Sequence, residues 1–306
     1  MIIKYILKRL FQVIPTIFGI ITLIFFSIHL IPGDPVDIML GENALPIAKM
    51  ELKRNLNLDK PLLEQYLIYL KNILFLNAGN SIFSHQPVFK EILARFPATL
   101  QLTILSIIIA IIIALPLGII SAVKKDSFID FFSRILSLSG ISIPNFWLGP
   151  MLIILFSIWL NLLPVSGKDN FLSYILPALT LGSHLAAVLT RMIRTSMLDV
   201  LKEHYILTAR AKGLNKFVIL FKHTFKNALI PVITIIGLQF GSLLSGSIIV
   251  ESVFAWPGIG KLLITAISTR DYPLVQSCVL FISVLFVFVN LITDICYSFV
   301  DPRIKY

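Results

Sequence analysis

The sequence has few charges, few cysteines and none of the residue groupings that most catalytic sites require. Charged residues make up 14% of the 306 positions, so the chain lacks the polar surface that a soluble fold of this length needs. Cys278 and Cys296 do not form a Cys-x-x-Cys motif, and we interpret them as two buried free thiols. The five histidines are scattered, with no pair at ligand spacing, so no metal site is predicted.

A phosphate-binding loop for ATP is also missing. The nearest string, at 256–262, follows Ala255 where the pattern requires Gly and ends in Leu262 where it requires Ser or Thr. The candidate nucleophiles lie in apolar segments without a nearby base, which argues against covalent catalysis. We therefore predict that the chain is not an enzyme and that energy from ATP would have to come from a partner.

What the sequence has instead is apolar residues gathered in long blocks. Hydrophobic residues make up 57% of the chain, and its mean hydropathy is +0.91. Six windows contain no Asp, Glu, Lys or Arg: 10–33, 96–123, 135–167, 170–190, 227–250 and 272–293. Each is long enough for the ~20 residues that a helix needs to cross a bilayer. The prediction is an all-α, polytopic membrane protein with six transmembrane helices.

Lysines and arginines are divided unequally between the two sides of these windows. Segments 1–9, 124–134, 191–226 and 301–306 hold 16 of the 26 basic residues, and their alternation with the windows puts them on one side. The positive-inside rule places that side, with both termini, in the cytoplasm. Topology thereby explains the net charge of +10, and no nucleic-acid partner is predicted.

The order of charged and apolar segments divides the chain into four parts. We predict a cytoplasmic N-terminus with a retained first helix at 1–31, an extracytoplasmic insertion with amphipathic helices at 32–96, a five-helix core at 97–300 and a cytoplasmic tail at 301–306. In the insertion, apolar residues at helical spacing after Pro61 predict an amphipathic helix on the membrane or on the outer rim of the protein. A second short helix is expected at 88–95.

Three features of the core admit more than one interpretation. The small residues around Pro144 in the third span suit close helix packing or a bend that gates a pore. Arg191 and Arg194, at the inner end of the fourth span, are expected to be solvated anchors. Asp294 lies inside the last span, and its carboxylate has three candidate roles there: structural pairing with another residue, gating, and proton relay.

The fifth span carries small and polar residues, among them Gly237 and Gly241. Such a surface suits a helix interface or a water-filled path better than contact with lipid. Gln239, Ser242 and Ser245 are therefore the candidates for lining a pore. The same surface argues against a receptor or scaffold that transports nothing.

A basic segment between the fourth and fifth spans is the most informative part of the chain. Each of its charges would cost about 3 kcal/mol in hydrocarbon, so the segment lies outside the membrane. Helix is expected from Leu198 to Arg210, Gly213 interrupts it, and Asn215 can cap a second helix from Lys216 to Ala228. Two helices joined by a glycine turn form an elbow that fits a groove on another protein. A solvated cytoplasmic loop is the alternative, which explains the charge but not the pattern of Ala and Gly.

Short motifs along nearly the whole chain follow the order of one family. They are Ile31-Pro32-Gly33-Asp34-Pro35, Arg95-Phe96-Pro97-Ala98-Thr99-Leu100, Ser142-Ile143-Pro144-Asn145-Phe146-Trp147, Thr208-Ala209-Arg210-Ala211-Lys212-Gly213-Leu214, Asn227-Ala228-Leu229-Ile230-Pro231, the stretch 251–260 and Arg270-Asp271-Tyr272-Pro273. Together they resemble the permease subunits of bacterial ABC importers in the dipeptide, oligopeptide and nickel branch. The long outer insertion resembles that of the first, B-type permease of a pair. The basic segment resembles the EAA loop of these permeases, although Leu207-Thr208-Ala209 stands where the general pattern has Glu-Ala-Ala.

The resemblance implies a fold, a location and a set of partners. The fold would be that of a type I ABC importer permease in the bacterial inner membrane. The partners would be a homologous second permease, two ATP-binding subunits that carry ATP and Mg²⁺, and an extracytoplasmic solute-binding protein, with no cofactor in this chain. The coupling loop would occupy 199–228. Contacts with the ATPase would be made by Thr208, Ala209, Arg210, Ala211, Lys212, Gly213 and Leu214.

The implied function is a translocation path for di- or oligopeptides that works by ATP-driven alternating access. Importers of nickel, of metal chelates and of glutathione share these motifs and are the alternatives within the family. A secondary transporter driven by an ion gradient is the alternative from another class. It would favour inverted repeats and several intramembrane acids, whereas this sequence shows no repeat and only Asp294.

Overall fold

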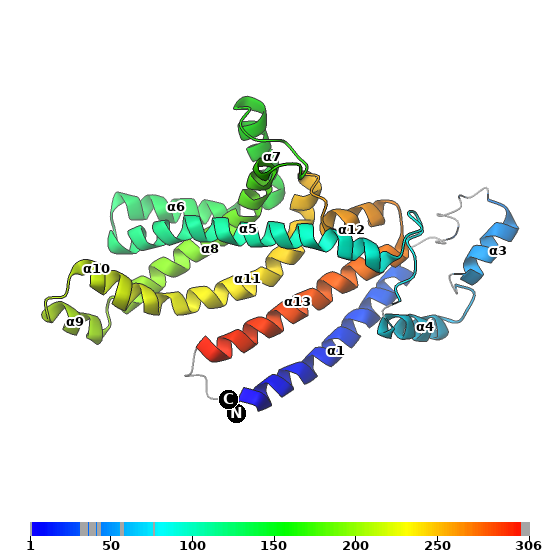
Figure 1. Cartoon of the computed structure of the whole chain (residues 1–306), viewed down its shortest axis with the longest axis horizontal. Helices are drawn as coiled ribbons and strands as arrows, with labels where there is room; N and C mark the ends of the chain where they lie inside the picture. Colours follow the sequence, from blue (N-terminus) through cyan, green and yellow to red (C-terminus); the bar gives the residue numbers. More distant parts are fainter. Residues whose placement is uncertain are drawn as a thin grey trace.

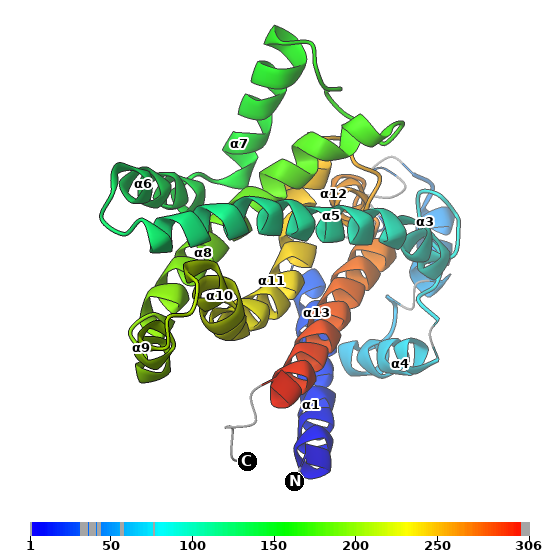
Figure 2. The ribbon, with the colours of Figure 1, turned by 60° about the vertical axis from the view of Figure 1, so that its left-hand side comes forward.

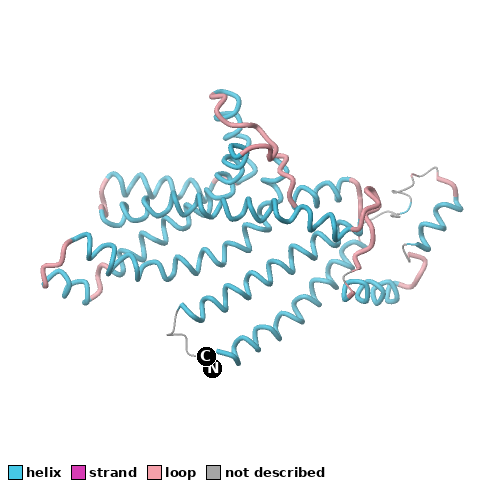
Figure 3. Tube along the Cα trace, in the orientation of Figure 1, coloured by secondary structure: helices cyan, strands magenta, loops and turns pink. Residues whose placement is uncertain are grey.

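A computed structural model describes residues 2–30, 36, 41, 44–55, 58–75 and 77–300. The regular secondary structure of these residues is helical, with loops between the helices, and their only β pairing is an isolated bridge between Asn80 and Pro87 (Figure 3). The prediction of an all-α protein is confirmed. The motif at 31–35 and the tail at 301–306 lie outside the described residues.

The helices follow one another along the chain in the order shown in Figure 1. They are α1 (Ile2–His29), α3 (Pro46–Asn55), α4 (Leu62–Leu74), α5 (Val88–Val123), α6 (Phe128–Ser142), α7 (Asn145–Leu152), the π-helix η1 (Ile153–Trp159), the 3-10 helix η2 (Phe171–Tyr174), α8 (Ile175–Val200), α9 (His204–Ala211), α10 (Lys216–Val218), the π-helix η3 (Ile219–Phe225), α11 (Lys226–Val253), α12 (Ile259–Ser268) and α13 (Tyr272–Val300).

The six predicted spans are present, but one of them is broken. Five helical stretches are long and apolar enough to cross a membrane, and α6 followed by α7 and η1 makes a sixth that is bent by 108°. The break falls at Ile143 and Pro144, where both residues are extended. Proline has no N–H and pushes the residue before it out of the helical region, so the third span bends where its sequence places Pro144. Figure 2 shows α7 projecting from the bundle beyond this break.

The two ends of the bundle differ in what they hold. The beginning of α1, the end of α13 and the segment from α9 to η3 lie at one end, whereas α3, α4 and α12 lie at the other (Figures 1 and 2). This arrangement agrees with the predicted topology, in which the N-terminus and the basic segment share the cytoplasmic side.

The core is built around the long contact between α5 and α8. Gly182 of α8 lies against the backbone of α5, and a Cβ placed there would be 2.5 Å from the carbonyl oxygen of Ser106. Buried Leu102 and Leu185 continue this contact along the two helices. A residue without a side chain at position 182 therefore allows the close approach that small residues give helices in membranes.

Gly182→Ala is expected to destabilise the chain by about 2 kcal/mol, because the new methyl group meets backbone rather than a movable side chain. Thermal unfolding in detergent measures the effect as a lower midpoint. Gly19→Ala in α1 is the matched control, since no atom lies within 4 Å of a Cβ built there. Equal midpoints for the two variants would contradict the close contact of α5 and α8.

The outer insertion is attached to α1 through aromatic residues. The predicted amphipathic helix is α4, which begins directly after Pro61. The Tyr66 hydroxyl lies 2.6 Å from Thr22 Oγ1, and the Tyr66 ring centroid lies 5.3 Å from that of Phe25. The helix therefore packs against α1, and its place on the membrane or on the outer rim of the protein stays a prediction.

The predicted short helix at 88–95 is not a separate element. Helix α5 continues without a break from Val88 through Pro97. Val88 and Ile92 are fully buried against residues of α12 and α13, including Cys278, which is a buried free thiol as predicted. This apolar contact maintains the helix across the proline, whose missing N–H costs a single backbone hydrogen bond. The side chain of Cys296 lies outside the described residues.

Two buried carboxylates fix the outer end of the bundle. Glu251 accepts hydrogen bonds from Thr99 Oγ1 at 2.7 Å and from the backbone N–H groups of Gly260 at 2.7 Å and Lys261 at 3.2 Å. The carboxylate thereby satisfies free N–H groups in the first turn of α12, where the helix dipole favours negative charge. In the motif 251–260, the first residue, Glu251, therefore caps α12, the helix that begins at Ile259.

Asp271 connects the outer insertion to α13. Its carboxylate accepts hydrogen bonds from Ser81 Oγ at 2.5 Å, from Ile82 N at 3.0 Å and from Phe83 N at 3.3 Å, and it also accepts one from Leu274 N at 3.2 Å. Asp271 is 1% exposed, so these donors replace the water that the charge loses on burial. The insertion is therefore held at the entrance of the last span.

Candidate functional site

The basic segment folds into the predicted elbow, with a glycine at its bend. Helix α9 ends at Ala211, and Gly213 has a φ of +74°. The N–H of Gly213 donates to Arg210 O at 3.0 Å, and the N–H of Leu214 donates to Ala209 O at 3.3 Å. This pair of hydrogen bonds is a Schellman motif, in which a glycine in the left-handed conformation ends a helix.

The second arm of the elbow begins with the predicted cap. The Asn215 side chain accepts a hydrogen bond from Phe217 N at 3.0 Å, and helix starts at Lys216. It does not stop at Ala228, however, because α10, η3 and α11 follow one another without a break. The second arm is therefore continuous with the fifth span. The π-helix η3 lies within this continuous helix, and there Thr224 Oγ1 donates to Ile219 O at 3.0 Å.

The first arm differs from its prediction in one place. Helix was expected from Leu198 to Arg210, but α8 ends at Val200 and α9 starts at His204. The turn at 201–203 rotates α9 so that Ile206 and Ala209 pack against Ile219 of the second arm, with Val200 and Leu201 beside them. Burial of this small apolar cluster explains why the helix breaks there.

A hydrogen-bond network connects the two arms at their base. Asn227 Nδ2 donates to Tyr205 OH at 2.9 Å and to His223 O at 2.9 Å. Asn227 opens the Asn-Ala-Leu-x-Pro motif, so this motif joins the first helix of the elbow to the start of α11. The apolar cluster and this network together give the elbow a rigid interior.

The outside of the elbow is basic and apolar. Of the seven residues predicted to contact a partner, Ala209 is buried, whereas the other six, Thr208, Arg210, Ala211, Lys212, Gly213 and Leu214, are exposed. Leu207 is 51% exposed and Phe217 72% exposed beside them. Apolar side chains rimmed by bases, on a rigid support in the aqueous phase, are typical of a protein-binding surface.

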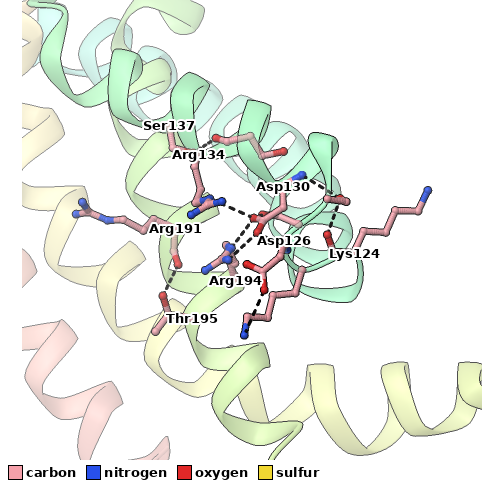
Figure 4. A network of polar contacts seen from close by, with 12 residues as sticks. Lys124, Asp126, Asp130, Arg134, Ser137, Arg191, Arg194 and Thr195 are labelled. Atoms are coloured by element: carbon pink, nitrogen blue, oxygen red, sulfur yellow. Dashed lines mark hydrogen bonds and ion pairs between the residues drawn. The ribbon is translucent and has the colours of Figure 1, made fainter.

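A buried ion pair lies where the end of α5, the start of α6 and the last turns of α8 meet (Figure 4). Asp130 is fully buried and accepts two hydrogen bonds from Arg194, from Nε at 2.6 Å and from Nη2 at 2.8 Å. Ser121 Oγ and the backbone N–H of Asp126, at 3.0 Å, also donate to this carboxylate. Arg134 Nε lies 3.7 Å from it.

The prediction that Arg194 is a solvated anchor is wrong, because its side chain is 17% exposed and bound to Asp130. Arg191 is exposed and points away from the cluster (Figure 4). The planar guanidinium of Arg194 matches the carboxylate in a two-bonded geometry that a lysine cannot reproduce. Loss of one partner from such a buried pair costs about 3–5 kcal/mol, since it leaves the other charge unpaired.

No local pattern of residues indicates this pair. Asp130 lies three residues after Ser127, whose side chain caps α6, so the local pattern is that of an ordinary helix start. Arg194 lies at the inner end of a span, where a basic residue is common. Only the packing of α6 on α8 brings the two together.

The pore candidates lie on α11 at different depths. Ser242 is exposed, whereas Gln239 and Ser245 are partly buried, and Ser245 Oγ donates to Ser242 O at 3.1 Å. Gly237 lies against Thr293 of α13, so part of the small-residue surface is a helix interface. The side chain of Asp294 is outside the described residues, and within those residues no group of three or more His, Cys, Asp or Glu side chains is placed to hold a metal ion.

The fold and the elbow together define a class of transport protein. Residues 114–306 match the family described as "Binding-protein-dependent transport system inner membrane component", and residues 2–103 match the family of the corresponding N-terminal region. The chain therefore belongs to the family of binding-protein-dependent transport system inner membrane components. It is a permease subunit of a type I ABC importer, not an enzyme, and its location is the inner membrane.

Two curated relatives and two solved structures make the comparison more specific. The chain is 45% identical over 303 residues to the "Glutathione transport system permease protein GsiC" of Pectobacterium atrosepticum, and 44% identical over 303 residues to that of Escherichia coli K12, with 99% of each chain covered in both cases. The inward-facing MetNI methionine ABC transporter has a similar fold, with 18% identity, a TM-score of 0.57, and coverage of 70% of this chain and 98% of that one. An amino acid ABC transporter is also similar, with 16% identity, a TM-score of 0.54, and coverage of 69% and 94%.

Proposed function

We propose that the elbow is the surface on which an ATP-hydrolysing subunit docks, and that this docking drives alternating access of the permease. The proposal rests on the construction of the elbow, with a rigid apolar interior and an exterior of bases and exposed apolar side chains. Because the second arm continues into α11, displacement of the elbow would tilt a membrane span directly. The assembly we propose has two ATPases, a homologous second permease and an extracytoplasmic solute-binding protein.

The energy source is tested by uptake into cells that express the complete transporter. Depletion of ATP at a constant ion gradient is expected to stop uptake, whereas collapse of the gradient at constant ATP is expected to leave the rate of uptake unchanged. The opposite result would favour a secondary transporter. Purification of the chain in a mild detergent is expected to retain an ATPase.

Phe217→Asp is expected to lower the amount of ATPase retained in detergent by about tenfold or more, because an exposed aromatic at the centre of an interface contributes most to binding. Quantitative immunoblotting of the purified complex measures the ratio of the two subunits. Lys125→Glu is the control, since Lys125 is exposed in the turn between α5 and α6, apart from the elbow. Equal retention by both variants would contradict docking on this surface.

We infer that the transported substrate is a small peptide, with glutathione as the first compound to test. Two features support this inference: the peptide-branch motifs of the sequence, and the 45% identity over 99% of the chain to a permease named for glutathione transport. No described feature favours nickel or a metal chelate over a peptide.

The substrate is tested with labelled compounds in a host that lacks its own importers for glutathione, dipeptides and nickel. We expect ATP-dependent uptake of glutathione or of a short peptide, competed by the unlabelled compound. Uptake of nickel alone would contradict the peptide proposal while leaving the ATP-driven mechanism intact.

A further inference from the structure

We infer that the ion pair of Asp130 and Arg194 is the link that transmits displacement of the elbow to the bent third span. The inference rests on the proposed function, in which the elbow is displaced by an ATPase. It assigns to this pair a positioning role in transport, through the helices it joins, without contact with the substrate.

The first step of the argument is the route from the elbow to Arg194. Helix α8 runs from Ile175 to Val200 and is followed, after the turn at 201–203, by the first arm of the elbow. Arg194 lies less than two turns before the end of α8. The packing of Val200 and Leu201 into the apolar cluster of the elbow joins the end of α8 to the elbow. Displacement of the elbow therefore acts on the segment that carries Arg194.

The second step is the polar face by which α6 packs on α8. Among the described residues of α6, the buried ones are Asp130, Ser133 and Ser137. Its large apolar side chains face outward instead, and Phe128 is 80% exposed. Near the other end of α6, Gly140 lies close to Ala187 of α8, since a Cβ built at Gly140 would be 2.9 Å from that of Ala187. The start of α6, away from this contact, therefore follows the core through its polar face.

The third step is the geometry of the pair itself. One carboxylate receives donors from three parts of the chain: Ser121 at the end of α5, the backbone of Asp126 in the turn, and Arg194 on α8 (Figure 4). The two hydrogen bonds from one planar guanidinium fix orientation as well as distance. The inner ends of α5, α6 and α8 thereby form one rigid body.

The last step is what α6 carries. After Ser142 the chain bends by 108° into α7 and η1, which project from the bundle. A displacement that enters at the elbow is therefore passed through α8 and the ion pair to α6, and from α6 to the bent half of the span. If the pair is broken, the elbow and α8 are expected to move while α6 lags behind.

The test is Asp130→Asn in the complete transporter, with uptake and ATP hydrolysis measured on the same preparation. Transport per ATP hydrolysed is expected to fall about fivefold or more, while ATP hydrolysis itself changes less than about twofold. Asp126→Asn is the matched control, because its exposed side chain leaves the ion pair intact and its backbone N–H still donates to Asp130. Ser121→Ala keeps the ion pair and removes one donor to Asp130. In this variant, transport per ATP hydrolysed should also fall, but by less than in Asp130→Asn.

Spin labels separate a positioning role from a structural one. In a chain without native cysteines, Phe132→Cys on α6 is paired with Lys202→Cys after α8, and Lys202→Cys is paired separately with Phe288→Cys on α13. Without the Asn substitution, ATP trapping is expected to change the distance between positions 202 and 288 and to leave the distance between positions 132 and 202 unchanged. With Asp130→Asn, both distances should change.

The outcomes distinguish the two proposals. The ion pair is not the link if Asp130→Asn leaves the ratio of transport to ATP hydrolysis unchanged and if, in that variant, ATP trapping does not change the distance between positions 132 and 202. If Asp130→Asn fails to assemble, Ser121→Ala decides, and an unchanged ratio in that variant likewise overturns the inference. If ATP trapping leaves the distance between positions 202 and 288 unchanged without the Asn substitution, the proposed displacement of the elbow fails instead.

Discussion

Gly213→Pro is expected to abolish ATP-coupled uptake while the chain is still inserted in the membrane. Gly213 has a φ of +74°, and the proline ring fixes φ near −65°, so the bend cannot form. The substitution also removes the N–H that donates to Arg210 O. Both hydrogen bonds of the Schellman motif depend on this residue, and the angle between the arms of the elbow would change with it. Uptake into vesicles loaded with ATP measures the loss.

The choice of residue at position 213 tests whether conformation is the cause. No atom lies within 4 Å of a Cβ built there, so a side chain meets no obstacle and only the backbone angle matters. Asparagine adopts the left-handed conformation readily, and Gly213→Asn is expected to retain most of the uptake. Gly213→Ala, with a strain of about 1 kcal/mol, should lie between the two.

Protease protection and the amount of chain in the membrane fraction serve as controls for insertion. If Gly213→Pro transports normally at wild-type ATP turnover, the elbow is not a rigid lever. If the Asn variant is as inactive as the Pro variant, the positive φ is not what matters at this position.

The elbow was predictable because its signals are local. The glycine that ends α9 and the asparagine that caps the next helix act within a few residues of themselves, so the two arms could be placed from sequence. The turn at 201–203 was missed because it is determined by the burial of Ile206 against Ile219. That contact joins residues of different helices, and helical periodicity carries no information about it.

The interior polar contacts were beyond prediction for a related reason. Asp130 and Arg194 lie 64 positions apart, and each taken alone has an ordinary interpretation, as a helix start and as a membrane-edge base. The same holds for Asp271, whose three donors at 81–83 come from the outer insertion. A single sequence gives the charge of such residues, but their partners follow from how the helices pack.

The broken third span is an intermediate case. Pro144 made a bend one of two interpretations, and the structure places a bend of 108° there. What the proline could not reveal is the direction of α7, since the residue only ends one helix and starts another. Whether the bend gates a pore stays a prediction.

Glu251→Ala is expected to have the largest effect on stability at the outer end of the bundle. The carboxylate is fully buried, and its removal leaves the N–H groups of Gly260 and Lys261 and the hydroxyl of Thr99 without their acceptor. A buried donor without an acceptor costs about 1–3 kcal/mol, so the loss over this site is expected to be about 4 kcal/mol. Thermal unfolding in detergent should show a clearly lower midpoint, and α12 should become accessible to protease.

Two further variants separate the cap from the charge. Glu64→Ala removes a carboxylate from an exposed pair with Lys60, which is worth about 0–1 kcal/mol, so it controls for the loss of an acidic side chain. Glu251→Gln keeps one oxygen that can accept from the start of α12, but it loses the charge and the oxygen that accepts from Thr99. We expect it to be less destabilising than Glu251→Ala. If the Gln and Ala variants unfold at the same temperature, the charge at the start of α12 accounts for the effect. If Glu251→Ala and Glu64→Ala unfold at the same temperature, the carboxylate of Glu251 does not hold α12.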